Sequence, residues 1–182
     1  MKTSIDINVA RGDIFEFAKN KCDAAILWLK PGFNGMFGNW LLEFLPGLKE
    51  HQIETYNSGG WETCNVLIDR AWKSESSALL RITPAVGRLK YLYIHPNPEG
   101  LRVKDISAVK EMTEAAMKAI VELPVVACCM NGIQSGKQDI DVQYAKVMFQ
   151  AVSEWFSTNK RQSLKEVFLV DLRGGFDNAA QA

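Results

Sequence analysis

A glycine-bearing loop in the last third of the chain has the residue types that bind phosphate. The stretch "VVACCMNGIQSGKQDIDVQYAKVMF", residues 125–149, joins an apolar run to an amphipathic one through this loop. Where a strand runs through such a loop into a helix, free backbone N–H groups and the positive helix end come together and attract phosphate oxygens. The loop therefore predicts an anion site, although Asn and Gly are also common in turns that bind nothing.

The same loop bears a partial likeness to an ATP-binding P-loop. That motif reads GxxxxGK followed by Ser or Thr, because its first glycine permits a tight wrap and its hydroxyl holds magnesium. In the register set by Gly136 and Lys137, Asn131 occupies the first glycine position and Gln138 occupies the hydroxyl position. The sequence therefore disfavours an ATPase.

Other side chains offer little catalytic or metal-binding chemistry. His95 stands between a strand pattern and Pro96, where a structural role is more common than that of a base, and His51 lies among polar residues. The cysteines show no CxxC spacing, so we expect them to be reduced and expect no metal site and no cofactor. They are Cys22, Cys64, Cys128 and Cys129.

Composition sets the class of protein. A chain of 182 residues with 21 basic and 21 acidic side chains has the makeup of one globular domain, and we expect residues 1–182 to form it. The balanced charge disfavours nucleic acid as a partner, and no apolar run is long enough to span a membrane. We therefore expect a soluble, cytoplasmic protein.

Alternating strand and helix patterns predict an α/β domain with a mixed sheet. The segment 174–182 is expected to be a loose tail, and the sequence leaves open whether 59–80 forms an extra hairpin or an interaction edge. The expected strands are 3–9, 23–29, 64–73, 77–85, 88–95, 124–130 and 165–172. The expected helices are a short one capped by Asp13, then 36–45, 105–123 and 141–156.

The order of five motifs over residues 5–172 resembles that of the macrodomain family. The motifs are "GDIFEFAKNKCDAAI", "GFNGMFG", "KYLYIHPNP", "VVACCMNGIQSG" and "EVFLVDL". The resemblance implies a three-layer α/β/α sandwich around a central mixed sheet. It also implies a cleft that receives ADP-ribose or a related small nucleotide, free or attached to an ADP-ribosylated protein.

The resemblance also implies which residues would bind this ligand. Asp13 would accept a hydrogen bond from the adenine amino group, beside Ile14, although Asp13 also has a simpler role as a helix cap. Phe176 would stack on adenine. Two loops would surround the diphosphate, and their residues are Gly35 and Gly38 in the first and Asn131, Gly132, Ile133, Gln134, Ser135 and Gly136 in the second.

Two departures from the family pattern weaken the case for an enzyme. Members that hydrolyse ADP-ribose linkages carry an Asn-rich segment after the second strand, where this chain has "LWLK" at residues 27–30, and often an aspartate where it has Phe37. Apolar groups cannot activate water. We therefore expect binding without turnover, and leave open an ADP-ribosyl hydrolase with atypical residues or a degenerate scaffold for protein contacts.

Overall fold

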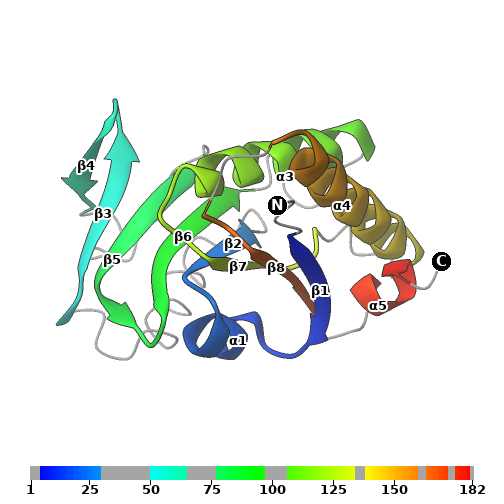
Figure 1. Ribbon diagram of the computed structural model, residues 1–182, viewed down its shortest axis with the longest axis horizontal. Helices are drawn as coiled ribbons and strands as arrows, with labels where there is room; N and C mark the ends of the chain where they lie inside the picture. Colours follow the sequence, from blue (N-terminus) through cyan, green and yellow to red (C-terminus); the bar gives the residue numbers. More distant parts are fainter. Residues whose placement is uncertain are drawn as a thin grey trace.

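Within the residues that the structure describes, eight strands form one mixed sheet between layers of helices (Figure 1). The computed structural model describes residues 5–29, 50–64, 77–96, 106–133, 138–159, 163–171 and 175–180. The strands are β1 (Asp6–Arg11), β2 (Ala24–Leu29), β3 (Gln52–Asn57), β4 (Gly60–Thr63), β5 (Ala78–Val86), β6 (Leu89–Pro96), β7 (Ala127–Met130) and β8 (Glu166–Asp171). The helices are α1 (Ile14–Lys21), α3 (Ile106–Val121), α4 (Gln138–Thr158) and α5 (Gly175–Ala180).

The sheet has a parallel half and an antiparallel half. Its strand order is β1-β8-β7-β2-β6-β5-β3-β4. The neighbours from β1 to β6 pair in parallel, whereas β6, β5, β3 and β4 pair in antiparallel fashion. The central strand β2 is a continuous apolar run, as expected of a parallel strand covered on both faces.

Alternate residues of β2 pack against opposite helix layers. Ala25 and Leu27 belong to the cluster that contains Phe15 of α1. Ile26 belongs to the second cluster, where it joins Met117 of α3 and other buried residues of α3 and α4. Figure 1 shows α1 on one face of the sheet and α3 with α4 on the other. The predicted three-layer sandwich around a mixed sheet is confirmed.

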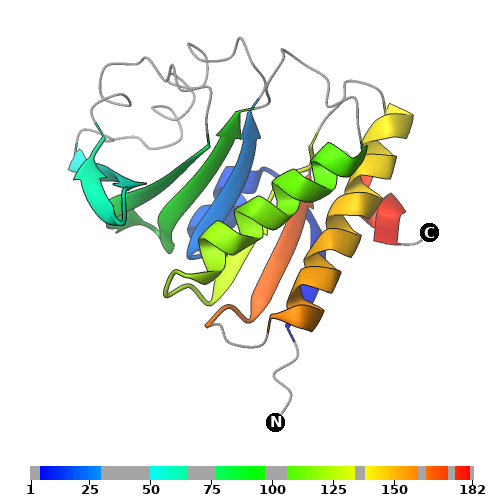
Figure 2. The same cartoon turned by 90° about the horizontal axis from the view of Figure 1, so that it is seen from above.

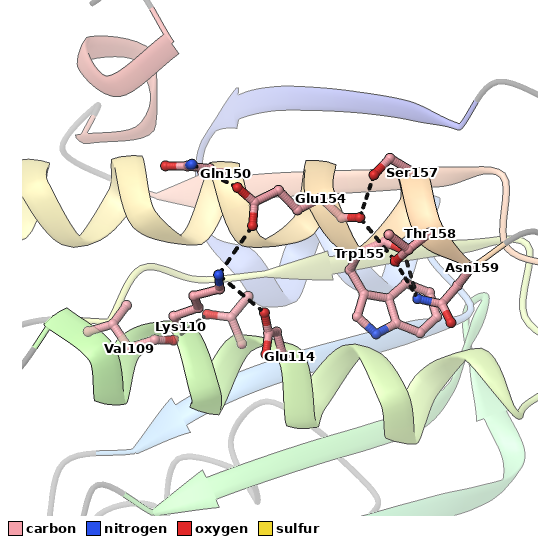
Figure 3. Close-up of polar contacts among 10 residues, drawn as sticks. Val109, Lys110, Glu114, Gln150, Glu154, Trp155, Ser157, Thr158 and Asn159 are labelled. Atoms are coloured by element: carbon pink, nitrogen blue, oxygen red, sulfur yellow. Dashed lines mark hydrogen bonds and ion pairs between the residues drawn. The ribbon is translucent and has the colours of Figure 1, made fainter.

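An exposed polar cluster joins α3 to α4 across their outer surfaces (Figure 3). Lys110 Nζ lies 3.3 Å from Glu154 Oε2 and 3.9 Å from Glu114 Oε1, and Gln150 Nε2 donates to Glu154 Oε1 at 2.8 Å. The hydrogen bond from Gln150, followed by the interactions with Lys110, lowers the pKa of Glu154 below its usual value. Because water screens these groups, the cluster adds little to stability.

A hairpin extends the antiparallel half of the sheet and includes the first residues of the segment 59–80. Strands β3 and β4 pair through a tight turn whose central residues, Ser58 and Gly59, have φ of 48° and 85°. Positive φ at both positions is the feature of the type I′ hairpin turn. Strand β4 is therefore an edge strand of the sheet, and Cys64 follows it rather than starting the strand predicted at 64–73. The rest of that segment, and the helix predicted at 36–45, lie outside the described residues.

The chain beyond β8 forms a docked helix where the sequence predicted a loose tail. The backbone N–H of Phe176 donates to Asp171 Oδ2 at 3.1 Å, and Arg11 Nε lies 2.6 Å from Asp177 Oδ2. The Phe176 side chain is 1% exposed within the core under α4. These contacts tie α5 to the ends of β1 and β8, next to the start of α1. Among the described helices, none is long and apolar enough to cross a membrane.

Candidate functional site

The parallel half of the sheet brings two of the predicted site residues, Asp13 and Asn131, to one edge. Because β1, β8, β7, β2 and β6 run in the same direction, their carboxyl ends meet at that edge. Asp13 follows β1, Asn131 follows β7, and Trp28 lies near the end of β2, where it pairs with His95 of β6. Figure 2 shows β2 and β6 side by side with their arrowheads at the same edge. Ligands of α/β sheets bind beyond such carboxyl ends.

A tight turn places Asp13 at the start of α1. Gly12 has φ of 149°, which disfavours any residue with a side chain, and its N–H donates to Asp171 O at 3.1 Å. Asp13 Oδ1 accepts from the N–H groups of Phe15 and Glu16 at 2.8 and 3.2 Å. The predicted helix cap is therefore confirmed. Asp13 is exposed, and Oδ2 accepts no hydrogen bond from the described part of the chain, so one carboxylate oxygen stays accessible to a ligand.

The side chain of Asn131 fastens the end of β7 to the end of β2. Its Oδ1 accepts a hydrogen bond from the backbone N–H of Trp28 at 3.1 Å, between residues 103 positions apart. The first residue of the predicted phosphate loop therefore has a structural role through its side chain. It sets the spacing between the β7 loop and β2.

The two residues after Asn131 anchor the loop in the core. The Ile133 side chain is 2% exposed, and its backbone N–H donates to Met148 Sδ at 3.4 Å, which directs this N–H into the protein. A Cβ atom added at Gly132 would lie 3.8 Å from the Phe176 ring, an ordinary contact distance. Gly132 therefore rests on Phe176, and an alanine would fit there.

Phe176 has a position that differs from the predicted adenine-stacking one. At 1% exposure, its ring has no face open to a ligand in this structure. It lies under Gly132 and joins α5 to the β7 loop. Sequence reasoning could not anticipate this contact, since Phe176 follows the last strand by only a few residues and the α5 segment shows no strong periodicity.

Trp28 has a feature that the apolar pattern of β2 conceals. The residue is 8% exposed, and its indole Nε1 has no hydrogen-bond partner in the described part of the chain. Its ring lies 5.6 Å from that of His95, which in turn lies 6.3 Å from Tyr93. Burial raises the pKa of Tyr93, and a hydrogen bond with Ser77 opposes part of this shift.

The described residues offer no evident nucleophile at this edge. Burial, with smaller contributions from Cys22 and Asp23, raises the pKa of the Cys128 thiol well above its usual value, so the thiolate is disfavoured. Leu27 is apolar and 2% exposed. No group of three His, Cys, Asp or Glu side chains in the described ranges is placed to hold a metal ion. The remaining predicted site residues lie outside the described residues, namely Gly35, Gly38, Gln134, Ser135 and Gly136.

Sequence comparisons find no match, whereas structural comparison finds proteins of the same fold. No protein-family model matches the chain, and no curated protein matches its sequence. One match is a Trypanosoma brucei macrodomain in complex with ADP, with a TM-score of 0.59 and 7% sequence identity. The match covers 97% of this chain and 68% of that chain. A second match is the macro domain of ganglioside-induced differentiation-associated protein 2, with a TM-score of 0.60 and 11% sequence identity. This match covers 99% of this chain and 83% of that chain.

A third structural match covers nearly the whole length of both chains. This match is a mutant form of the Oceanobacillus iheyensis macrodomain with ADPR, with a TM-score of 0.51 and 13% sequence identity. It covers 100% of this chain and 95% of that chain. The sheet order, the helix layers and these matches over nearly the whole chain agree with the expectation from the motif order. The protein has the macrodomain fold.

Proposed function

We propose that this protein binds ADP-ribose, or a related small nucleotide, along the carboxyl edge of its parallel strands. The observation that carries the proposal is the placement of Asp13 and Gly132 at the ends of β1 and β7, with only β8 between them. Strands lie about 4.8 Å apart, so these two ends are separated by roughly 10 Å, a span that one nucleoside diphosphate can bridge. Structures of the same fold that contain ADP or ADP-ribose support this choice of ligand.

In the proposed complex, the two ends hold different parts of the nucleotide. Asp13 accepts a hydrogen bond from the adenine amino group through its accessible oxygen, and Ile14 lies beside the base. The β7 loop contacts the diphosphate through Gly132. Asn131 and Ile133 fix the position of this loop, because the Asn131 side chain bonds the Trp28 N–H and the Ile133 N–H points into the core. Phe176 acts by supporting this loop from below. The proposal assigns the rest of the diphosphate contacts to Gly35, Gly38, Gln134, Ser135 and Gly136.

The proposed activity is binding without turnover. Hydrolysis needs a group that accepts a proton from water, and the side chains of Leu27 and Trp28 near the end of β2 are buried and offer no such group. The buried thiol of Cys128 lacks the thiolate character of a nucleophile. We therefore propose a reader of free ADP-ribose or of ADP-ribosylated proteins.

Calorimetric titration with ADP-ribose tests the proposal. We expect saturable binding to the wild-type protein and a loss of at least tenfold in affinity for Gly132→Glu, which adds bulk and negative charge beside the anion. Gly132→Ala is the matched control, because its Cβ meets the Phe176 ring at an ordinary distance and brings no charge. Thermal unfolding of each variant verifies that the core around Phe176 is intact.

Two further measurements separate this proposal from its alternatives. Lys137→Ala should leave the affinity nearly unchanged if main-chain N–H groups hold the diphosphate, whereas a loss equal to that of Gly132→Glu, or a magnesium requirement, would indicate a P-loop. Release of free ADP-ribose from a modified protein would show a hydrolase. No binding of ADP-ribose or ADP by the folded wild-type protein would contradict the proposal outright.

A further inference from the structure

The outer edge of β4 is one end of the sheet in the described part of the chain. β4 is the last strand in the order of the sheet, and Figure 1 shows it at the end opposite β1. A strand at such an edge has main-chain N–H and C=O groups that can pair with a strand of another molecule. Glu62 and Thr63 of β4 are exposed, so this edge is accessible.

The pairing of β4 with β3 determines which of its main-chain groups point outward. The Cys64 N–H donates to Ile53 O at 2.8 Å, so these two residues form a hydrogen-bonded pair. Such pairs alternate with non-hydrogen-bonded pairs along an antiparallel ladder, and Thr63 lies opposite Glu54 in the next pair. The N–H and C=O groups of Thr63, and by the same alternation those of Trp61, therefore point away from β3.

The two faces of β4 differ in chemistry. Trp61 lies on the same face as Arg81, whose guanidinium is 4.4 Å from the centre of the indole ring, and as Tyr56, which is 47% exposed. Glu62 points to the opposite face, where Asn57 Nδ2 lies 3.4 Å from its Oε2. None of the ion pairs in the described part of the chain includes Glu62. A strand added to β4 therefore meets an aromatic ring on one face and an unneutralised carboxylate on the other.

The position of Glu62 disfavours a second copy of this chain as the partner. Two β4 strands in antiparallel pairing can use both Trp61 and Thr63 of each strand only when the two-fold axis passes beside Glu62. That register places the two Glu62 carboxylates directly opposite each other in a closely spaced, non-hydrogen-bonded pair. Like charges at such positions are destabilising, whereas a cation opposite Glu62 is favourable.

We propose that the β4 edge binds an extended peptide segment of another protein that places Lys or Arg opposite Glu62. The peptide main chain pairs in antiparallel fashion with Trp61 and Thr63. The residues on either side of the basic one lie on the face of Trp61, where β-branched or aromatic side chains pack well. This surface and the proposed nucleotide site lie in different halves of the sheet, so the proposal does not depend on the proposed function.

Selection from a phage-displayed library of random linear peptides tests the proposal. We expect the folded wild-type protein to enrich peptides with Lys or Arg between two β-branched or aromatic residues. Glu62→Lys should instead enrich peptides with Asp or Glu at the central position. In calorimetry with the best selected peptide, Glu62→Gln should raise the dissociation constant about two- to fivefold. Asp13→Ser, a change in the proposed nucleotide site, should bind this peptide as the wild type does.

A proline substitution separates main-chain pairing from side-chain contacts. Thr63→Pro removes the outward N–H and leaves the ladder between β3 and β4 intact, because proline is tolerated on an edge strand where the N–H faces solvent. It should weaken peptide binding by about tenfold. Thr63→Val is the matched control, because it keeps the N–H, and it should bind the peptide like the wild type. Hydrogen exchange at the Cys64 amide verifies that the hairpin is intact in both variants.

The contrary outcomes are distinct. No enrichment of any peptide, enriched peptides without a basic residue, or binding that survives Thr63→Pro in an intact hairpin would overturn the proposal. A wild-type dimer in analytical ultracentrifugation that Thr63→Pro dissociates would also overturn it, since the edge would then bind a second copy of the chain.

Discussion

At the scale of single residues, Asp13 shows how one carboxylate can serve both the fold and a ligand. One oxygen caps α1 through the N–H groups of Phe15 and Glu16, while the other accepts no hydrogen bond from the described residues. The two roles that the sequence left as alternatives can therefore coexist. They can also be separated by substitution, because serine is a good helix cap and carries no carboxylate.

Asp13→Ala and Asp13→Ser should differ in stability and agree in binding. Removing the cap with alanine should lower the free energy of unfolding by about 1 kcal/mol, whereas serine should preserve most of it. Both variants lose the acceptor for adenine, so both should bind ADP-ribose about tenfold more weakly. Urea denaturation and calorimetry measure the two effects. Wild-type affinity in Asp13→Ser would mean that the carboxylate is a cap and nothing more.

Asn131 carries the connection between β7 and β2. Asn131→Ala removes the acceptor of the partly buried Trp28 N–H and should lower the free energy of unfolding by about 1 to 2 kcal/mol. Asn131→Asp keeps an oxygen at the same position and should lose less. Urea denaturation gives the stabilities, and hydrogen exchange at the Trp28 amide reports the bond directly. Unchanged exchange at that amide in Asn131→Ala would refute this role.

At the scale of elements, the β3–β4 hairpin is held by side chains on one face. The Arg81 guanidinium lies 4.4 Å from the centre of the Trp61 ring and 2.7 Å from Glu54 Oε2. Tyr56 meets Trp61 edge-on at 5.2 Å between ring centres, and Tyr91 of β6 lies 6.0 Å from the same ring. Trp61 therefore joins the hairpin to the rest of the sheet.

Trp61→Ala should let the hairpin open locally without affecting the proposed site. Loss of the cation–π and aromatic contacts, worth about 1 kcal/mol together, should speed exchange of the Cys64 amide roughly fivefold. This amide donates to Ile53 O at 2.8 Å. Trp61→Phe keeps a ring and should have a smaller effect, and amides of β2 should not change in either variant. Uniformly faster exchange across the sheet would indicate global rather than local opening.

The elements that the sequence predicted differ from those it missed in how clearly their burial shows in their own residue pattern. Strands β2 and β8 have continuous apolar patterns because both core clusters cover them, and helices α3 and α4 have clear apolar faces because each packs into one core cluster. Strand β3 buries little more than Ile53, so its pattern is faint, and its main signal was the Ser58 and Gly59 turn. The six residues of α5 form a helix through contacts with Asp171 and Arg11, which no local pattern reveals.

At the scale of the whole molecule, the two halves of the sheet have different roles. Its parallel half brings Asp13, Asn131 and Gly132 to one edge, and its antiparallel half extends the sheet away from them. The motif order was enough to predict the fold. It could not predict that Phe176 is buried under Gly132 or that the Trp28 indole N–H lacks an acceptor in the described part of the chain, since both depend on contacts between distant segments.

Ligand binding should stabilise the whole domain, because only the folded chain brings β1 and β7 together. At an ADP-ribose concentration one hundred times the dissociation constant, the gain should be about 2.7 kcal/mol. For a chain of this size, that gain corresponds to a rise in melting temperature of roughly 5 to 10 °C. Differential scanning fluorimetry measures the shift. A similar rise in the Gly132→Glu variant would mean that the stabilising site lies elsewhere.

A crystal structure of the protein with ADP-ribose would show most directly whether one nucleotide joins the ends of β1 and β7. We predict electron density for adenine beside Asp13 and for the diphosphate beside Gly132. Density for a ligand bound away from this edge, or an edge closed by side chains at saturating ADP-ribose, would contradict the proposed function and leave only the fold.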